Sequence, residues 1–398
     1  MSQKTHSDLS RTSHREPTRS KSLNPAPMHA MTDASTTTAT AATELPSART
    51  IARRLGLALL AAGAGVALLT ALPGLEELPA HLAGADPSWI ALALVLEIAS
   101  TLSFVLAFHG SYDRRVRRRA SAGIALAMQG MNILLPAGGS GGLAVGAVMM
   151  DRAGVPRGFT ASRTVALFLV TSLVTFAAIA AAGLGVATGL LDGDAALAAT
   201  LVPALGALLV IAAVVALPRV RRARTPAELP ADAGRARRAV AGAITHLHDG
   251  IEAAVDLLRG KDPLVIWGSI GNFAFDVATL AAAAHAVGAE GLPIGLLVLA
   301  YTLGHAGAII PLPGSSEGGL VAAFVLYGAA LAPITAAVLA YRSLHAGVPT
   351  VMGLFGMTDA RRQIRRGGLL REGGDARGSR AGNGAVLGLP SAPVLRRA

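Results

Sequence analysis

The 398-residue chain is 52% hydrophobic and only 15% charged, and its mean hydropathy is +0.53. A soluble domain carries about 25% charged residues, so this composition excludes an ordinary soluble protein and predicts a membrane protein. The chain has no cysteine, which excludes disulfide bonds, thiol catalysis and thiolate metal sites. Its net charge of +11 could suggest nucleic-acid binding, but the distribution of charge along the chain argues against it.

Basic and acidic loops alternate along the chain. Basic residues gather in residues 1–54, Asp113–Arg119, Arg219–Arg238 and the segment after Met357. The intervening acidic residues are Glu76, Glu77, Asp86, Asp192, Asp194 and Glu290. Basic loops face the cytoplasm and its anionic lipids. We therefore expect a multi-pass protein with both termini in the cytoplasm and no nucleic-acid partner. The Arg-, Ala- and Gly-rich composition indicates a bacterial cytoplasmic membrane.

Three regions follow in chain order. Residues 1–50 are polar, rich in Ser and Thr and aperiodic, which predicts a disordered cytoplasmic arm. Residues 51–357 form the expected transmembrane domain, and residues 358–398 a basic, Gly/Arg-rich, disordered cytoplasmic tail. Apolar stretches of about 20 residues suit spanning helices. The expected spans are 53–73, 88–109, 120–150 (interrupted), 164–187, 197–217, 263–286, 293–331 (interrupted) and 336–357.

Residues 218–262 interrupt these spans with a basic cytoplasmic loop. Apolar residues recur every three or four positions from Val240 to Leu258, which predicts an amphipathic helix lying on the membrane or on the bundle. His246 and His248 are two residues apart and do not share a helix face. We therefore predict no metal site there, and no cofactor elsewhere in the chain.

A helix-breaking phrase occurs twice: LPAGGSGGL begins at Leu135 and LPGSSEGGL begins at Leu312. Each phrase follows a Trp and an acid and precedes an Arg. The two sets are Trp89, Glu97, Arg163 and Trp267, Asp276, Arg342. This order predicts an internal, inverted repeat. The expected fold is an all-α polytopic membrane protein with about 6–8 crossing helices and two broken or re-entrant segments. Charge counting does not decide whether residues 293–331 make two crossings or one re-entrant hairpin.

Proline and clustered glycine release backbone N–H and C=O groups from a helix. An unsatisfied group in hydrocarbon costs several kcal/mol, so a break is tolerated only inside protein or beside a wet cavity. Duplicated breaks in transporters mark the substrate site; the alternative is a tight helix crossing through small residues. The residues concerned are Pro136, Gly138, Gly139, Gly141, Gly142, Pro311, Pro313, Gly314, Gly318 and Gly319.

Few charged residues interrupt the apolar spans. They are Glu97, Asp276 and Arg342, with Glu317 in the second phrase. A charge at the centre of a span costs about 2.5–3.5 kcal/mol, so each is a candidate functional residue. Polar neighbours extend the predicted substrate path: Asn272 on the helix face of Asp276, Asn132 before the first phrase and His305 before the second. The alternative is a structural ion pair between Arg342 and either Asp276 or Glu317.

One resemblance covers about residues 50–357. The stretch IIPLPGSSEGGLVAAFVLYG, followed by AAVLAYRSLHAGVP, resembles the transmembrane flippase-like domain of bacterial lysylphosphatidylglycerol synthases, and NILLPAGGSGGL matches the earlier family phrase. The matching residues include Pro311, Pro313, Gly314, Glu317, Gly318, Gly319, Tyr341, Arg342 and Pro349. The family run before the acid is longer and richer in glycine; here Ser315–Ser316 shorten it.

The resemblance implies lipid translocation between leaflets, on a pseudo-symmetric fold with re-entrant segments, and it adds Tyr341 to the substrate path. The synthases also carry a soluble aminoacyl-transfer domain, which we do not find after Met357. We therefore expect no synthase activity. Membrane lipids are the expected partners, Arg342 suits a lipid phosphate, and the acids suit a cationic headgroup or a coupling proton. A homo-oligomer is left open.

Three alternatives remain. The first is a proton-coupled exporter of a small polar or amphipathic solute, and the second is a structural membrane-assembly protein. The third and weakest is an intramembrane serine hydrolase that uses Ser140, in the G-x-S-x-G of Gly138–Gly142, with His305. A nucleophile elbow needs a strand before the serine, and none is predicted. We therefore do not expect an enzyme.

Overall fold

The computed structural model describes residues 74–112, 114–134, 140–221, 248–289, 292–305 and 314–366, with single positions at 49, 52, 53, 56, 60 and 234. All of them lie in Leu45–Ala398, the second of two units into which the chain divides; the first is Met1–Glu44. Within the described residues the structure is helical and contains no strand, which confirms the predicted all-α fold. Nearly all of the predicted arm and of the span 53–73, and all of residues 367–398, lie outside this description.

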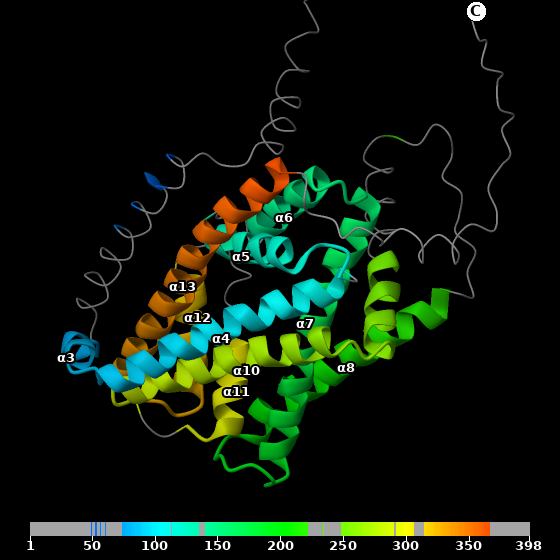
Figure 1. Cartoon of the computed structure of the whole chain (residues 1–398). Helices are drawn as coiled ribbons and strands as arrows, with labels where there is room; N and C mark the ends of the chain where they lie inside the picture. Colours follow the sequence, from blue (N-terminus) through cyan, green and yellow to red (C-terminus); the bar gives the residue numbers. More distant parts are fainter. Residues whose placement is uncertain are drawn as a thin grey trace, which may run out of the picture. The chain divides into compact units, whose positions relative to one another are not determined.

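The helices, labelled in Figure 1, fall into two similar series. The first series is α4 (Pro87–Ser111), α5 (Arg118–Leu134), α6 (Ser140–Arg152) and α7 (Arg157–Ala187). The second is α10 (Pro263–Ala286), α11 (Ile294–Gly304), α12 (Ser315–Leu326) and α13 (Leu331–Arg365). The short α3 (Leu78–Ala83) precedes the first series, and α8 (Leu197–Arg221) lies between them. The last helix therefore continues past residue 357, where the tail was expected to begin.

Four helices in the described part of the chain are long and apolar enough to cross a membrane: α4, α7, α8 and α10. Helices α11 and α12 are apolar but shorter. The pairs α5–α6 and α11–α12 flank the two predicted breaks, while the break residues 135–139 and 306–313 lie outside the described ranges. The chain is thus a multi-pass membrane protein.

Helices α4 and α10 start in the same way and pack against each other in opposite directions. Asp86 and Asp262 cap them by accepting hydrogen bonds from the N–H groups of Ser88 and Leu264, and a proline follows each cap. The N–H of Asp86 donates to the carbonyl of Ala286 at 2.8 Å, which joins the start of α4 to the end of α10. The two helices are therefore antiparallel neighbours.

The two series also exchange partners. Helix α5 of the first series packs against α13 of the second, and α11 of the second packs against α7 of the first. The α5–α13 crossing is close because it uses glycine: a Cβ added to Gly130 would lie 2.7 Å from the carbonyl oxygen of Pro349 and 2.9 Å from Cα of Gly353. Small residues let membrane helices approach in this way.

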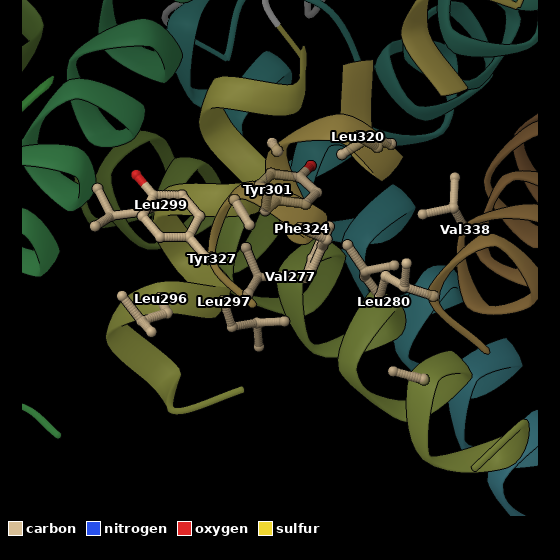
Figure 2. Close-up of a cluster of buried hydrophobic side chains, with 14 of the residues drawn as sticks. Val277, Leu280, Leu296, Leu297, Leu299, Tyr301, Leu320, Phe324, Tyr327 and Val338 are labelled. Carbon is tan, nitrogen blue, oxygen red and sulfur yellow. The ribbon is translucent and has the colours of Figure 1, made fainter. Parts of the chain in front are cut away.

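A buried apolar cluster joins α10, α11, α12 and α13 (Figure 2). It includes Leu280 of α10, Leu299 of α11, Phe324 of α12 and Val338 of α13, all almost fully buried. Close packing of this kind holds side chains in defined positions. The cluster thereby fixes Tyr301 on α11 and the helices that carry the polar residues described next.

Residues 248–259, within the predicted amphipathic segment, are helical. Ala254 and Leu257 are buried there against Ala166 and Val170 of α7 and Val265 of α10. The apolar face of this segment therefore packs on the bundle. Its residues before 248 lie outside the described ranges.

Candidate functional site

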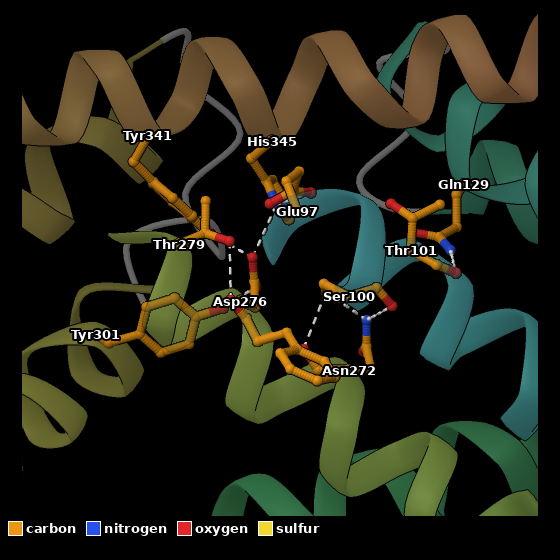
Figure 3. Close-up of polar contacts among 11 residues, drawn as sticks. Glu97, Ser100, Thr101, Gln129, Asn272, Asp276, Thr279, Tyr301, Tyr341 and His345 are labelled. Atoms are coloured by element: carbon orange, nitrogen blue, oxygen red, sulfur yellow. Dashed lines mark hydrogen bonds and ion pairs between the residues drawn. The ribbon is translucent and has the colours of Figure 1, made fainter. Parts of the chain in front are cut away.

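Two of the predicted charged residues meet at the α4–α10 contact. Glu97 of α4 is 1% exposed and Asp276 of α10 is 9% exposed. His345 of α13 lies between them, with Nδ1 at 3.2 Å from Oε1 of Glu97 and 3.1 Å from Oδ1 of Asp276. Figure 3 shows the three side chains converging from three helices. The described structure contains no Lys or Arg ion pair to either carboxylate.

Two tyrosines hold the carboxylate of Asp276. The hydroxyl of Tyr341 donates to Oδ1 at 3.2 Å, and the hydroxyl of Tyr301 donates to Oδ2. The ring of Tyr341 stacks on that of His345, with 5.3 Å between ring centroids. Tyr341 and His345 are four residues apart and therefore share one face of α13. This arrangement fixes both the carboxylate and the imidazole.

One turn away, Asn272 and Ser100 clasp α10 to α4 (Figure 3). On the far side of α4, Gln129 of α5 donates to the carbonyl of Thr101 at 3.2 Å. Each bond satisfies a polar group that would otherwise be unpaired inside an apolar bundle. The predicted residue Asn272 therefore has a structural contact as well as a place in the polar region.

A cavity of about 250 Å³ opens beside Asp276, between α7, α10 and α11. His305, a predicted path residue, also lines it, and its Nδ1 lies 2.7 Å from the carbonyl oxygen of Tyr301. Hydroxyl groups dominate the wall; they come from Thr171, Ser172, Thr175, Ser269, Tyr301 and Thr302. Ser269 is buried, and its hydroxyl makes no hydrogen bond to any described residue. The wall can therefore offer hydrogen bonds to a polar guest.

The other two predicted charges pair with each other. Nε of Arg342 donates to Oε1 of Glu317 at 2.8 Å, which joins α13 to α12. Both side chains are partly exposed, 28% for Arg342 and 33% for Glu317. This is one of the two ion pairs that the sequence left open, and the structure forms it with Glu317. Neither group is fully buried by this contact.

The remaining predicted residues do not line the cavity or lie outside the described ranges. Asn132 is exposed near the end of α5 and does not line the cavity. Five break residues lie outside the described ranges: Pro136, Gly138, Gly139, Pro311 and Pro313. The other five lie at the starts of α6 and α12: Gly141, Gly142, Gly314, Gly318 and Gly319. The side chain of Ser140 is outside the description, so the alternative that pairs it with His305 is not tested.

The glycines of the two phrases differ in their surroundings. Gly142 approaches the backbone carbonyl of Met128 so closely that a Cβ would collide with it, which is the small-residue crossing weighed against a functional break. Gly314 precedes α12 with φ of +81°, where a side chain would be strained. A Cβ on Gly318 would meet nothing within 4 Å. Close packing therefore explains Gly142 and does not explain Gly318.

Sequence reasoning missed His345 and the hydroxyl-bearing face of α7. Both carried a usable signal, because His345 follows Tyr341 by four residues and Thr175 follows Thr171 by four. Each pair occupies one helix face. Histidine escapes a search for charged residues, since with its usual pKa of about 6.5 it is mostly neutral at pH 7.

The two carboxylates lie on α4 and α10, both long and apolar enough to span a bilayer, and α7, a third such helix, forms part of the cavity wall. Ionisable groups at such depth mark paths for ions or polar substrates. A search of curated proteins finds no match. A family model described as "Lysylphosphatidylglycerol synthase TM region" matches residues 55–353, most of the chain and the whole of the site. The chain belongs to this family.

Proposed function

We propose that the protein moves a lipid or lipid-like substrate between the leaflets of the membrane. The observation that carries the proposal is the hydroxyl-lined cavity beside the buried carboxylate of Asp276. The family supports a lipid-related membrane role. The protein acts in this proposal as a transporter and not as an enzyme.

The physical need is to carry a polar headgroup across about 30 Å of hydrocarbon. A headgroup that leaves water loses its hydrogen bonds, and an unpaired polar group costs several kcal/mol in an apolar medium. The hydroxyl of Ser269 and the amide oxygen of Asn272, both at the cavity wall, can replace some of those bonds. The acyl tails would stay in lipid alongside the bundle. The headgroup alone would then need the polar cavity.

We infer that the two helix series form an inverted repeat. Three features support it: the antiparallel contact of α4 with α10, the acid that each carries at their contact, and the exchange of α5 and α11 between the series. In transporters, inverted repeats rock against each other around a central site and open it to each side in turn. A headgroup at the cavity beside Asp276 would thereby reach both leaflets.

The charged residues take separate roles in this proposal. Arg342, partly exposed, would bind a lipid phosphate by charge-assisted hydrogen bonds and exchange them with its bonds to Glu317. Glu97 and Asp276 would bind a cationic headgroup or carry a coupling proton. We place the protein in a bacterial cytoplasmic membrane with both termini in the cytoplasm, because the basic loops lie on one side in that arrangement.

A second candidate is a proton-coupled exporter of a small polar solute. The cavity favours it in one respect, because about 250 Å³ holds a small molecule without lipid tails. The same groups would bind the solute and the proton. The two candidates differ in the cargo, so one assay with a choice of cargo separates them.

The test is reconstitution into liposomes that contain headgroup-labelled lipids, with a membrane-impermeant quencher added outside. Wild type is compared with Asp276→Asn and Arg342→Ala, each checked for folding by circular dichroism. Asp194→Asn is the matched control, because it makes the same chemical change in an exposed loop. We expect wild type and the control to expose inner-leaflet label and the two site variants to lose that activity.

Absence of lipid translocation by wild type would contradict the proposal. If wild type matches empty liposomes for anionic, zwitterionic and cationic headgroups, with and without a proton gradient, lipid translocation is wrong. Counterflow of small polar solutes in the same liposomes then tests the exporter.

A further inference from the structure

The atoms around His345 have the spacing of a metal-binding site. One atom each from Glu97, Asp276 and His345 lies within 4.8 Å of the others. The two nitrogen–oxygen distances are 3.1 and 3.2 Å. A metal ion binds nitrogen and oxygen ligands at about 2.0–2.2 Å, which places neighbouring ligand atoms about 3–3.5 Å apart. The two nitrogen–oxygen distances therefore match the ligand spacing of a metal site.

The hydrogen bonds of the cluster leave two atoms without a partner. Nδ1 of His345 is within ion-pair distance of both carboxylates but makes no properly directed hydrogen bond to either. Oε2 of Glu97, on a side chain that is 1% exposed, has no hydrogen-bond partner among the described residues. A single Nδ1–H can point to only one of two carboxylates. A buried carboxylate oxygen without a partner is costly, so the cluster favours a cation that contacts all three side chains.

We propose that Glu97, Asp276 and His345 bind one divalent transition-metal ion. Two carboxylates and a neutral imidazole carry two negative charges, which one divalent ion neutralises. Imidazole and carboxylate together suit Zn²⁺, Mn²⁺ or Fe²⁺ better than Ca²⁺ or Mg²⁺, which prefer oxygen ligands alone. Both orphan atoms gain a partner: Nδ1 gives its lone pair to the ion, and Oε2 can bind it in a bidentate carboxylate.

The second layer of residues fits this assignment. Metal-ligating carboxylates are usually hydrogen-bonded by outer residues that orient them. Tyr341 and Tyr301 do this for Asp276, and the stacked ring of Tyr341 orients His345. The side chain of His345 is 31% exposed, while its Nδ1 is buried and turned towards the two carboxylates. The three ligands come from α4, α10 and α13, and the ion would tie these helices together.

In this assignment the ion takes the place of the cationic headgroup or coupling proton that the proposed function gives to Glu97 and Asp276. Metal binding is tested by itself, without a transport assay. Full-length protein in lipid nanodiscs is stripped with a chelator and titrated with Co²⁺, whose visible absorption reports ligation; Zn²⁺ is then added as competitor. We expect one Co²⁺ per chain, displaced by Zn²⁺. Glu97→Gln and His345→Gln should each weaken binding at least about 100-fold, since loss of a ligand exceeds the 10–100-fold cost of losing an outer residue. Tyr341→Phe should weaken it about 10-fold.

Asp194→Asn again serves as the control and should bind as wild type does. It also accounts for weak binding by surface carboxylates. Because a ligand variant could fail to fold, the wild-type protein loaded with Cu²⁺ provides a second measurement. Pulsed electron paramagnetic resonance should show nitrogen coupling from a single imidazole. Absence of Co²⁺ binding, or binding that both ligand variants retain while folded, or a copper signal without nitrogen coupling, would overturn the proposal.

Discussion

Asn272 of α10 and Ser100 of α4 bind each other through both side chain and backbone. Nδ2 of Asn272 donates to the Ser100 hydroxyl at 3.0 Å and to its carbonyl at 3.2 Å. The Ser100 hydroxyl donates in turn to the carbonyl of Asn272 at 3.0 Å. This clasp lies one turn from Glu97 and Asp276, so it sets the separation of the two carboxylates. Substitution of Asn272 therefore tests whether this clasp holds α4 and α10 together at the site.

Asn272→Ala should destabilise the fold by about 1 kcal/mol. It removes both bonds from Nδ2, and a net hydrogen bond is worth about 0.5–1.5 kcal/mol, with values near 0.6 kcal/mol measured between membrane helices. The measurement is the loss of helicity as sodium dodecyl sulfate is added to protein in mild detergent. Ser343→Ala is the control, because its hydroxyl bonds only within α13 and should be near neutral. Equal midpoints for the two variants would show that the clasp does not hold α10 to α4.

The pair of Arg342 and Glu317 separates a structural role from a substrate role. Arg342→Glu and Glu317→Arg should each cost about 1 kcal/mol or less, because the pair is partly exposed and such pairs are weak. The double variant restores the pair with its charges exchanged. If Arg342 binds substrate phosphate as proposed, the double variant regains stability in the detergent assay but not transport in liposomes.

Recovery of both properties in the double variant would assign the pair to structure alone. A further control is Arg342→Lys, which keeps the charge but loses the planar, multi-donor geometry that suits phosphate. We expect it to fold normally and to transport more slowly than wild type.

Sequence predicted the helices and the buried acids because each has a strong local signal. Long apolar runs define spans, and a charge such as Glu97 within a span is rare enough to mark a site. The antiparallel contact of α4 and α10 agrees with the predicted inverted repeat. The cost of placing polar or charged groups in a bilayer therefore makes spans and buried acids predictable from the sequence.

The sequence did not predict side-chain contacts between helices, because these depend on how each helix is rotated about its axis. Asn132, assigned to the substrate path on its position before the first phrase, is exposed and does not line the cavity, so its role stays a prediction. His345 was overlooked, although α13 turns it towards Glu97 and Asp276. Spacing along one helix fixes which residues share a face. It does not fix which neighbour that face meets.

The α5–α13 crossing is such a contact, and two glycines of α13 test it. A Cβ on Gly353 would lie 2.7 Å from Cα of Gly130 and 2.8 Å from the carbonyl oxygen of Leu126. A Cβ on Gly347 would meet nothing within 4 Å. Gly353→Ala should therefore force α5 and α13 apart and cost about 1–3 kcal/mol, as overpacking does.

Gly347→Ala should instead be neutral or stabilise by up to about 1 kcal/mol, since alanine favours the helix. The difference between the two unfolding midpoints in detergent is the measurement. The same substitution on the same helix cancels the intrinsic preference for alanine. A tolerated Gly353→Ala would show that the crossing is looser than the structure has it.

The cap of α4 predicts a pH dependence. The Ser88 hydroxyl and N–H donate to the carboxylate of Asp86 and lower its pKa below 3.8. A carboxyl whose pKa is lower in the folded state stabilises the fold above its unfolded pKa, and this contribution is lost as pH falls through the folded value. The stability difference between wild type and Asp86→Ala should therefore be constant from neutral pH down to about pH 5 and shrink below about pH 4. Asp86→Asn, which cannot ionise but still accepts a hydrogen bond, should show no such change. A difference that stays constant down to pH 3 would mean that the charge of Asp86 does not contribute to the cap.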